Sequence, residues 1–513
     1  MSRLAYFLII FFAIAFWASC RKDFEYVPSS GNLQFSKDTV YLDTIFSNIG
    51  SSTYALKVYN KTGIDLEIPS IHLREGQNSP FRLNVDGSAG KSFTNIPIFA
   101  GDSLFIFIET TVDAAQVNSA SMLFTDAIQF DNGANLQEVQ LVTLVKDAIF
   151  LYPKTTPNGT KETLLLGTDI AGNDIIVNGF VLPQDQMQFT NEKAYVIYGY
   201  AAVPENTTLD IQAGARVFFH KNSGIWVQPK ASIHINGALS TDSLLLEKEV
   251  IFEGDRLEPN YANVAGQWGT LWLASGSTDN LIDHLTLKNA TVGVFVEGDG
   301  ILDTPTLRIK NTRIYNSSNS NLWGRSAFIE AENLVLGNAG SSSLYCNLGG
   351  NYSFVHTTIA NYWTDTFRSG PALRIDNSMV LSTGENLSGD LTKAHFVNSI
   401  IAGNNNVELS LISNGSNTFL YSFTDCSMRF EDNTGQFQGN AHYEFQNTEY
   451  YNRLYLNESP GFINPSRNNF RLVQGSSAMG KAQLEAAQLV PLDILGRDRT
   501  PIPDLGAFQS TEN

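Results

Sequence analysis

The chain has 513 residues, a length that predicts two or three domains rather than one hydrophobic core. Hydrophobic residues make up 43% and charged residues 16%, which excludes a disordered chain and a coiled coil. The 33 Lys and Arg against 51 Asp and Glu give a net charge of −18, so no nucleic-acid partner is expected. Three cysteines are too few for a disulfide-rich scaffold.

Residues 1–19 predict an export signal. Arg3 supplies a basic start, and residues 4–17 form an unbroken apolar run that ends two small residues before Cys20. The run is shorter than the ~20 apolar residues of a membrane span and suits a secretory signal. The small residues before Cys20 resemble the bacterial lipobox, with Trp17 where a Leu is usual. This resemblance implies cleavage before Cys20 and a lipid anchor on its thiol, which attaches the protein to the membrane.

Residues 20–31 are expected to form a tether. Lys22, Asp23 and Glu25 resemble, in part, a surface-export tag of Gram-negative lipoproteins, and residues 28–31 are rich in Pro, Ser and Gly. The resemblance implies a cell-envelope protein, an outer-membrane lipoprotein exposed at the cell surface.

Residues 32–148 predict a β-sandwich. Apolar and polar residues alternate in short runs such as YALKVYN (54–60) and EVQLVTLVKD (138–147), and turn signals separate the runs at about ten-residue spacing. The pattern resembles immunoglobulin-like modules at the front of secreted bacterial proteins. Residues 149–164 hold two prolines and a glycine, and we expect them to be a linker.

From residue 165 to 449 a six-residue unit recurs, which predicts a solenoid. Six of seven copies begin with Asn or His, and the fourth residue of those six is apolar. Successive copies start 27, 22, 23, 21, 21 and 28 residues apart, close to the ~20–25 residues of one parallel β-helix coil. Asn at a repeated turn tolerates the left-handed conformation and can bond the Asn of the next coil. The copies are HLTLKN (284–289), NTRIYN (311–316), NLVLGN (333–338), HTTIAN (356–361), NSMVLS (377–382), NSIIAG (398–403) and CSMRFE (426–431).

Three further segments carry a resemblance to a known superfamily. Residues 208–239 and 266–296 are similar to right-handed parallel β-helix proteins of the pectin-lyase-like superfamily, and residues 491–509 resemble the closing segment of many secreted β-helix proteins. The fold class predicted is all-β, with an immunoglobulin-like β-sandwich followed by a right-handed parallel β-helix over 165–449. Residues 450–513 are expected to close that helix. The superfamily includes lyases, hydrolases, epimerases and proteins without catalysis, so the resemblance implies no single activity.

Binding of glycan or another surface partner is the function the sequence favours, because no familiar acid–base motif is present. Trp268 and Trp363 are expected to be exposed and to stack on sugar rings. Asp255, Arg256 and Glu258 lie in a segment expected to bulge from the helix, where binding residues often lie. The alternative for the tryptophans is core packing, and for the loop a capping role.

A carbohydrate-active enzyme, either a polysaccharide lyase or a glycoside hydrolase, is the competing hypothesis. Such an enzyme needs two carboxylates, or a base with a cation that neutralises a uronate. Its candidates are His284, Arg308 and Lys310, although His284 and His356 occupy the Asn position of the unit and fit a turn role. Ca²⁺ is a possible cofactor under the lyase hypothesis alone, because no cluster of Asp residues indicates a metal site.

Overall fold

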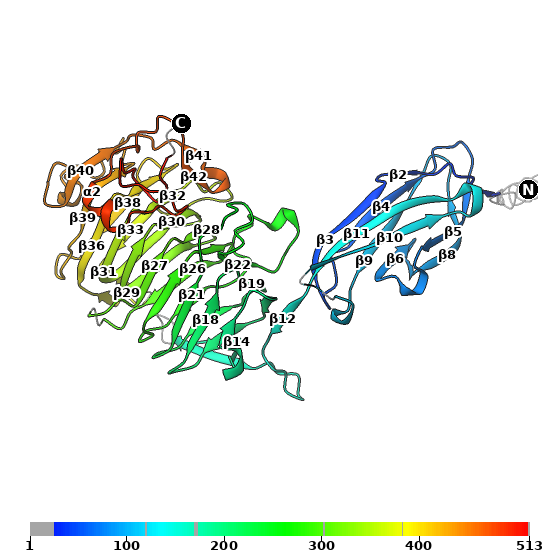
Figure 1. Cartoon of the computed structure of the whole chain (residues 1–513), viewed down its shortest axis with the longest axis horizontal. Coiled ribbons are helices and arrows are strands. Elements are labelled where there is room, and N and C mark those ends of the chain that lie inside the picture. The colour runs from blue at the N-terminus through cyan, green and yellow to red at the C-terminus, as the bar shows by residue number, and fades with distance from the viewer. Residues whose placement is uncertain are drawn as a thin grey trace, which may run out of the picture. The chain divides into compact units, whose positions relative to one another are not determined.

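The computed structural model describes residues 25–117, 119, 121–168, 173–300, 303–381 and 383–510, and the predicted signal with Cys20 lies outside them. The described chain is almost all strand, and its contacts divide it after Asp147 into two units (Figure 1). The predicted fold class is confirmed: an immunoglobulin-like β-sandwich and a right-handed parallel β-helix. Among the described residues, no helix is long and apolar enough to cross a membrane.

The sandwich consists of two sheets whose strands bury alternate residues, as every second residue of β11 is buried from Val139 onward. The first sheet has the order β2 (Gln34–Phe35), β4 (Tyr54–Tyr59), β9 (Ser103–Thr110), β6 (Phe81–Val85) and β7 (Ser88–Gly90). The second has the order β1 (Val27–Pro28), β5 (Leu66–Leu73), β10 (Ser121–Phe130), β11 (Gln137–Lys146) and β3 (Thr39–Phe46), with β8 (Ser92–Ile98) on β5. The connections hold the 3-10 helices η1 (Gly76–Asn78), η2 (Ala114–Gln116) and η3 (Gly133–Asn135).

The sandwich begins earlier than residue 32, so the predicted tether 20–31 is too long. β1 pairs in parallel with β5 inside the segment expected to be flexible. The Ser29 hydroxyl donates a hydrogen bond to the buried Asp131 carboxylate, and the Gly31 amide donates to the same side chain at 3.3 Å. These bonds satisfy a carboxylate that burial would otherwise penalise, and they hold the leading segment against the domain.

The β-helix stacks three parallel sheets, here called sheets A, B and C in chain order within a coil. Sheet A contains β14 (Asp174–Val181), β17 (Tyr200–Val203), β20 (Gly224–Val227), β23 (Leu271–Leu273), β26 (Val292–Glu297), the first halves of β29 (Ser320–Glu332) and β31 (Leu344–Val355), β33 (Leu373–Asp376) and β38 (Leu409–Ile412). Sheet B contains β15 (Gln188–Phe189), β18 (Thr208–Gln212), β21 (Ser232–Asn236), β24 (Asn280–Asp283), β27 (Leu307–Lys310), the second halves of β29 and β31, β36 (Leu391–Val397) and the first halves of β39 (Ser422–Met428) and β40 (Tyr451–Leu456). Sheet C contains β12 (Ala148–Leu151), β16 (Ala194–Ile197), β19 (Arg216–Phe219), β22 (Val250–Gly254), β25 (Leu285–Lys288), β28 (Arg313–Ser317), β30 (Val335–Ala339), β32 (Thr358–Asn361), β37 (Ile400–Gly403) and the second halves of β39 and β40.

The interior of the helix is filled by columns of equivalent side chains. Phe354, Phe396 and Phe423 form one such column, with successive ring centroids 5.1 and 4.9 Å apart. Strands in register about 4.8 Å apart place these rings over one another, so each coil adds one member to each column.

From β24 onward the turn from sheet B to sheet C is centred on one residue in the left-handed conformation, as the repeat predicted. His284, Asn311, Asn333, His356 and Asn398 have φ between 49° and 51°. Asn tolerates this conformation better than most residues, because its short polar side chain can bond locally. In the coil of β39 this turn residue is Asp425, with φ 49°, so the unit begins one residue before Cys426, and in the coil of β40 it is Arg453, with φ 54°.

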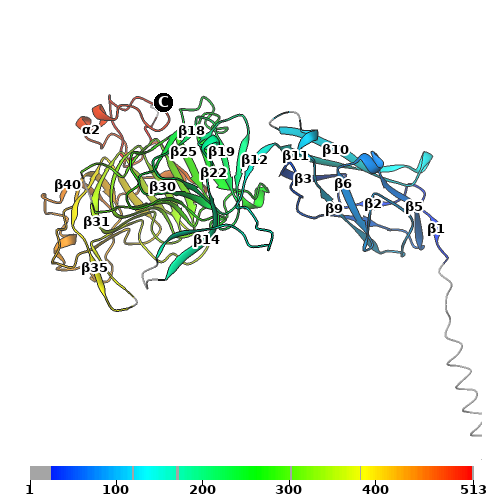
Figure 2. The same cartoon turned by 90° about the horizontal axis from the view of Figure 1, so that it is seen from below.

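The copy at 377–382 is not a coil repeat. β34 (Ser378–Val380) pairs with β35 (Asn386–Ser388) as an antiparallel hairpin inserted between sheets A and B. The hairpin projects from the coils, and sheet C resumes only at β37 (Figure 2). The two spacings of 21 residues, from 356 to 377 and from 377 to 398, therefore span a single coil that contains an insertion.

The predicted ends of the helix also shift. β12 pairs with β16, so the coils begin at Ala148 and most of the predicted linker 149–164 leads into the β13 (Thr163–Thr168) hairpin with β14. β40 still pairs with β39, so the coils continue past residue 450 to Leu456. The short helices η4 (Gln184–Gln186), η5 (Pro259–Tyr261) and η6 (Ala441–Tyr443) lie in the connections.

The C-terminal segment folds back over the outer face of sheet C. It contains β41 (Phe462–Asn464), η7 (Pro465–Arg467), β42 (Asn469–Leu472) and α2 (Leu484–Leu489). Phe470 and Phe508 pack against outward residues of sheet C, among them Tyr315. Gly337 leaves the room for this contact, since a Cβ there would lie 2.3 Å from the Phe470 ring.

Arg499 of this segment fills a gap in the ladder of turn side chains. Asn333 bonds Asn311 at 3.0 Å, and the Asn398 side-chain nitrogen lies 3.0 Å from His356 Nε2. Between the two pairs, the Arg499 guanidinium donates to Asn333 Oδ1 at 2.6 Å and contacts His356 Nδ1. Burial, and then the Arg499 charge, hold the pKa of His356 well below its ordinary value of 6.5.

We expect His356 to make the β-helix less stable in mild acid. The unfolded chain takes up a proton at His356 near pH 6.5, whereas the folded chain does not, so stability is full above that pH and falls as the pH drops below it. His356→Asn, which keeps a residue suited to the left-handed turn, should remove a loss of about 1.4 kcal/mol per pH unit. Urea unfolding at pH 7.5, 6.5 and 5.5 measures the difference, and equal slopes for parent and variant would contradict it.

Candidate functional site

Five aromatic side chains form a row along the outer face of sheet A. Trp226 pairs with Trp272, Trp272 with Phe295, Phe295 with Trp323, and Trp323 with Tyr345. Alternate residues of a strand point outward, and the coils stack in register, so one ring per coil reaches the same line. We call this set the aromatic row.

The rings of the aromatic row are spaced at the distance between coils. Ring centroids are 5.2 Å apart from Trp272 to Phe295, 5.0 Å from Phe295 to Trp323 and 5.4 Å from Trp323 to Tyr345. Side chains of the β13–β14 hairpin cover Trp226, whereas Trp272, Trp323 and Tyr345 are partly exposed. At the start of these strands a cavity of about 480 Å³ is lined by Tyr200, Asn222, Thr270 and Thr291, with Ile176, Val177, Asn178, Gly269 and Val292.

A polar row runs beside the aromatic row, two residues further along the same strands. Glu297 pairs with Arg325, Arg325 pairs with Asn347, and Asp376 follows on the next strand. Arg325 bonds Glu297 at 3.3 Å and lies over the rings of Phe295 and Trp323, 5.1 and 5.3 Å from their centroids. The guanidinium is therefore held between a carboxylate and two aromatic faces.

Asp376 is fully buried at one end of the polar row. Its side chain is 1% exposed and accepts hydrogen bonds from Tyr345 at 2.8 Å, Asn347 at 2.6 Å and Arg374 at 3.2 Å. Burial, and then the Asp376 charge, raise the pKa of Tyr345 well above its ordinary value, so the phenol stays a donor. Asp376 thus fixes the orientation of three side chains at one end of the face.

Several polar atoms on this face have no partner among the described residues. They are Trp323 Nε1, Arg325 Nε and Asn347 Oδ1, and each is buried from solvent. A buried polar atom without a hydrogen bond costs about 1–3 kcal/mol. Two donors and one acceptor thus lie unsatisfied and enclosed beside the aromatic row.

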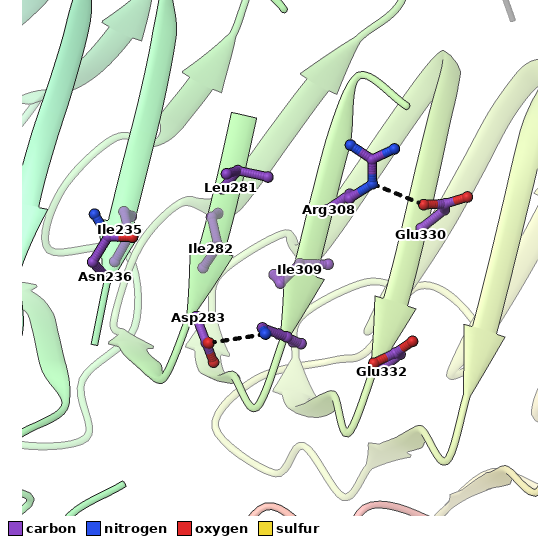
Figure 3. Close-up of a pocket in the computed structure, with 10 residues that line it drawn as sticks. Ile235, Asn236, Leu281, Ile282, Asp283, Arg308, Ile309, Glu330 and Glu332 are labelled. Carbon is purple, nitrogen blue, oxygen red and sulfur yellow. Dashed lines mark hydrogen bonds and ion pairs between the residues drawn. The ribbon is translucent and has the colours of Figure 1, made fainter. Parts of the chain in front are cut away.

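Two of the three enzyme candidates, Arg308 and Lys310, lie on a different face, the outer side of sheet B, and His284 stands at the turn that follows β24 (Figure 3 shows the groove). His284 Nδ1 lies 2.6 Å from Asp283, and Lys310 Nζ lies 3.3 Å from the same carboxylate. Arg308 pairs with Glu330 at 3.1 Å. Arg308 and Lys310 line a groove of about 320 Å³ together with Asp283, Glu330, Glu332, Asn236, Leu281, Ile235, Ile282 and Ile309, whereas His284 lies outside that lining.

Two carboxylates of this groove have pKa values that diverge. Burial acts to raise the pKa of Asp283, but contacts with His284, Asn311 and Lys310 outweigh it and lower the pKa. Burial is the main cause that raises the pKa of Glu332, with Lys310 opposing it. The groove is otherwise a ladder of alternating charge, in which Asp283, Lys310 and Glu332 follow one another on adjacent strands.

The structure contradicts the expected exposure of Trp268 and Trp363. Trp268 is 1% exposed, stacks on Phe219 with centroids 4.1 Å apart, and donates to the Lys288 carbonyl at 2.9 Å. Trp363 is 7% exposed and donates to Thr366 Oγ1 at 3.1 Å. Both rings are buried by neighbouring residues of the β-helix, so neither has an open face on which a sugar could stack.

The segment around residue 255 is a loop, but its charges are satisfied within the protein. Asp255 lies 2.8 Å from His220 Nδ1, and burial raises the pKa of Asp255. Arg256 pairs with Glu258 at 2.8 Å and lies over the Tyr261 ring at 3.9 Å. This arrangement fits a capping role better than a ligand site. Among the described residues, no three His, Cys, Asp or Glu side chains are placed to hold a metal ion.

The sequence patterns did not predict the aromatic row as a set. Its signal lies in the repeat: each member stands on the strand that follows the turn closing the previous coil. Aligning the sheet A strands with one another, rather than judging each Trp by its neighbours, separates Trp272 and Trp323 from Trp268.

The sequence matches no protein-family model and no curated protein. Among solved structures, a PapD-like domain of human CEP192 is 10% identical over 25% of this chain and 94% of that chain, with a TM-score of 0.16. A family 123 glycoside hydrolase from Clostridium perfringens is 7% identical over 24% of this chain and 30% of that one, with a TM-score of 0.16. The catalytic domain of a GH87 alpha-1,3-glucanase is 9% identical over 72% and 82%, with a TM-score of 0.18. No activity is transferred from these similarities.

Trp268 and Trp272 should differ sharply in their effect on stability. Trp268→Ala removes a fully buried ring and should lower the free energy of unfolding by about 3–5 kcal/mol. Trp272→Ala removes a partly exposed ring and should cost clearly less. Urea unfolding followed by circular dichroism compares the two variants, and equal losses would show that Trp268 is not a core residue.

Proposed function

We propose that this protein is a lipid-anchored protein of the cell envelope whose β-helix binds glycan along sheet A. The partly exposed rings of the aromatic row carry the proposal. Aromatic faces stack on the apolar faces of sugar rings, while the polar row offers donors and acceptors to hydroxyl groups. A row that spans five successive coils suits a polymer better than a small molecule.

Binding is favoured over catalysis on this face by the spacing of its carboxylates. Glu297 and Asp376 stand three strand spacings apart, about 14 Å. Glycosidases place their two carboxyl groups about 5–9.5 Å apart. Both side chains are also bonded to arginines, which keeps them as positioning groups.

A carbohydrate-active enzyme, either a polysaccharide lyase or a glycoside hydrolase, is the second candidate, and the groove on sheet B favours it. Asp283 and Glu332 stand two strand spacings apart, about 10 Å, close to the separation of an inverting pair. Their diverging pKa values suit a base and an acid. Lys310 and His284 would then position the Asp283 carboxylate, and Ca²⁺ would be needed only for a lyase acting on uronates.

Removing a ring of the aromatic row should weaken glycan binding. The full chain in detergent is tested on surfaces coated with xylan, laminarin, dextran or mannan. Trp323→Thr should weaken binding about tenfold, since an aromatic contact is worth about 1.4 kcal/mol. Tyr152→Thr removes a 63% exposed ring outside the row and should change nothing. Equal binding by both variants, or release of reducing ends from any of the four polymers, would contradict the proposal.

Lipid attachment should depend on Cys20 alone. Expression in a Gram-negative host supplied with labelled palmitate should label the parent chain, and Cys20→Ser should abolish the label. Cys426→Ser, a change at a buried cysteine of the core, is the matched control and should retain the label. A label that persists in Cys20→Ser would show that the anchor is elsewhere.

A further inference from the structure

Two phenylalanines on the sandwich stand exposed side by side. Phe105 and Phe107 lie on the outward face of β9 with 47% and 45% of their surface exposed. Their rings are nearly parallel, 11° apart, with centroids separated by 6.2 Å. Burying such rings is favourable, so two that remain exposed and aligned offer a flat platform to a ligand.

The neighbours of Phe107 leave its ring accessible. Its partners on the adjacent strands are Ala55 on β4 and Asn84 on β6, which are both small. Next to the ring a pocket of about 380 Å³ is lined by Arg82, Leu83, Asn84, Ala89, Gly90, Lys91, Phe107 and Glu109. That volume lies in the range of small-molecule sites, which is about 300–1,000 Å³.

Polar groups converge on the same pocket. Arg82 donates to Thr111 at 3.0 Å and lies 3.6 Å from Glu109, so part of its guanidinium and part of the carboxylate remain available. The Asn84 side-chain amide makes no hydrogen bond to any of the residues that the structure describes. Lys91 is held by the carbonyls of Gln77 and Ser79 and closes one wall. Donors and acceptors thus stand beside an aromatic face.

The size and charge of this surface suit a saccharide rather than a protein. The apolar strip is two rings, and Lys57 lies 5.2 Å over the Phe105 ring and 5.2 Å over the Tyr59 ring. A stable protein interface needs about 800 Å² on each partner with an apolar centre. Here charged side chains border the rings on both sides, and the pocket holds a mixed donor and acceptor set that matches hydroxyl groups.

We propose that the outer face of the sheet β2-β4-β9-β6-β7 is a second saccharide site. In it Phe107 stacks on one face of a pyranose ring, Phe105 supports the next sugar, and Arg82, Asn84 and Glu109 bind the hydroxyls. The site does not depend on the glycan site proposed for sheet A, since it lies in the other unit and uses none of its residues.

Retardation of the full chain in native gels cast with xylan, laminarin, dextran or mannan tests the site. Phe107→Thr keeps a residue suited to a strand and should reduce retardation by at least one of these polymers about tenfold in apparent affinity. Tyr41→Thr, which removes a 67% exposed ring from the other sandwich sheet, is the matched control and should migrate as the parent.

The Trp323→Thr background separates the two proposals. Retardation that survives Trp323→Thr and is lost when Phe107→Thr is added supports the sandwich site. If Trp323→Thr leaves the retardation unchanged, the result contradicts the glycan site on sheet A and does not affect the proposal for the sandwich. The sandwich proposal is overturned if Phe107→Thr migrates as Tyr41→Thr does in all four gels, or if none of the four polymers retards the parent chain.

Discussion

The left-handed turn between sheets B and C is the constraint on which the rest of the β-helix depends. From β24 onward a single residue turns the chain from one sheet to the next there, and each coil returns to the same position one strand spacing on. The interior columns, the ladder of turn side chains and the aromatic row all follow from that registry. A residue that strains at positive φ would disturb one coil and, through registry, its two neighbours.

This constraint also explains what the sequence could predict. A turn that accepts few residue types leaves a visible trace, so the recurrence of Asn311, Asn333 and Asn398 is enough to predict the coils from the amino-acid sequence. The pattern failed at 377–382 because an Asn before apolar residues also begins a hairpin, and local composition does not distinguish the two. Likewise, the residues around Trp268 and Trp272 do not indicate which of the two side chains faces the interior. The register between neighbouring strands decides the direction of each side chain, and this register is set only when the coils stack.

The outer faces of the three sheets differ in how much of their surface is left accessible to a ligand. The C-terminal segment covers the sheet C face, and salt bridges satisfy most charges of the sheet B face. The sheet A face combines partly exposed rings with unsatisfied donors and acceptors. Exposed ion pairs in water contribute little and are easily exchanged, whereas a partly exposed ring keeps apolar surface that a ligand can cover. These rings, rather than the number of polar residues, distinguish the sheet A face.

The insertion of Arg499 between Asn333 and His356 ties the end of the chain to coils that precede it by more than 140 residues. During synthesis the ladder therefore stays open in its middle until almost the whole polypeptide has been made. A product that stops short of residue 499 would leave Asn333 and His356 without their shared partner and Phe470 with only part of its cover. The middle of the helix is therefore finished by a residue that is made long after it, and until then the outer face of sheet C stays open to proteases.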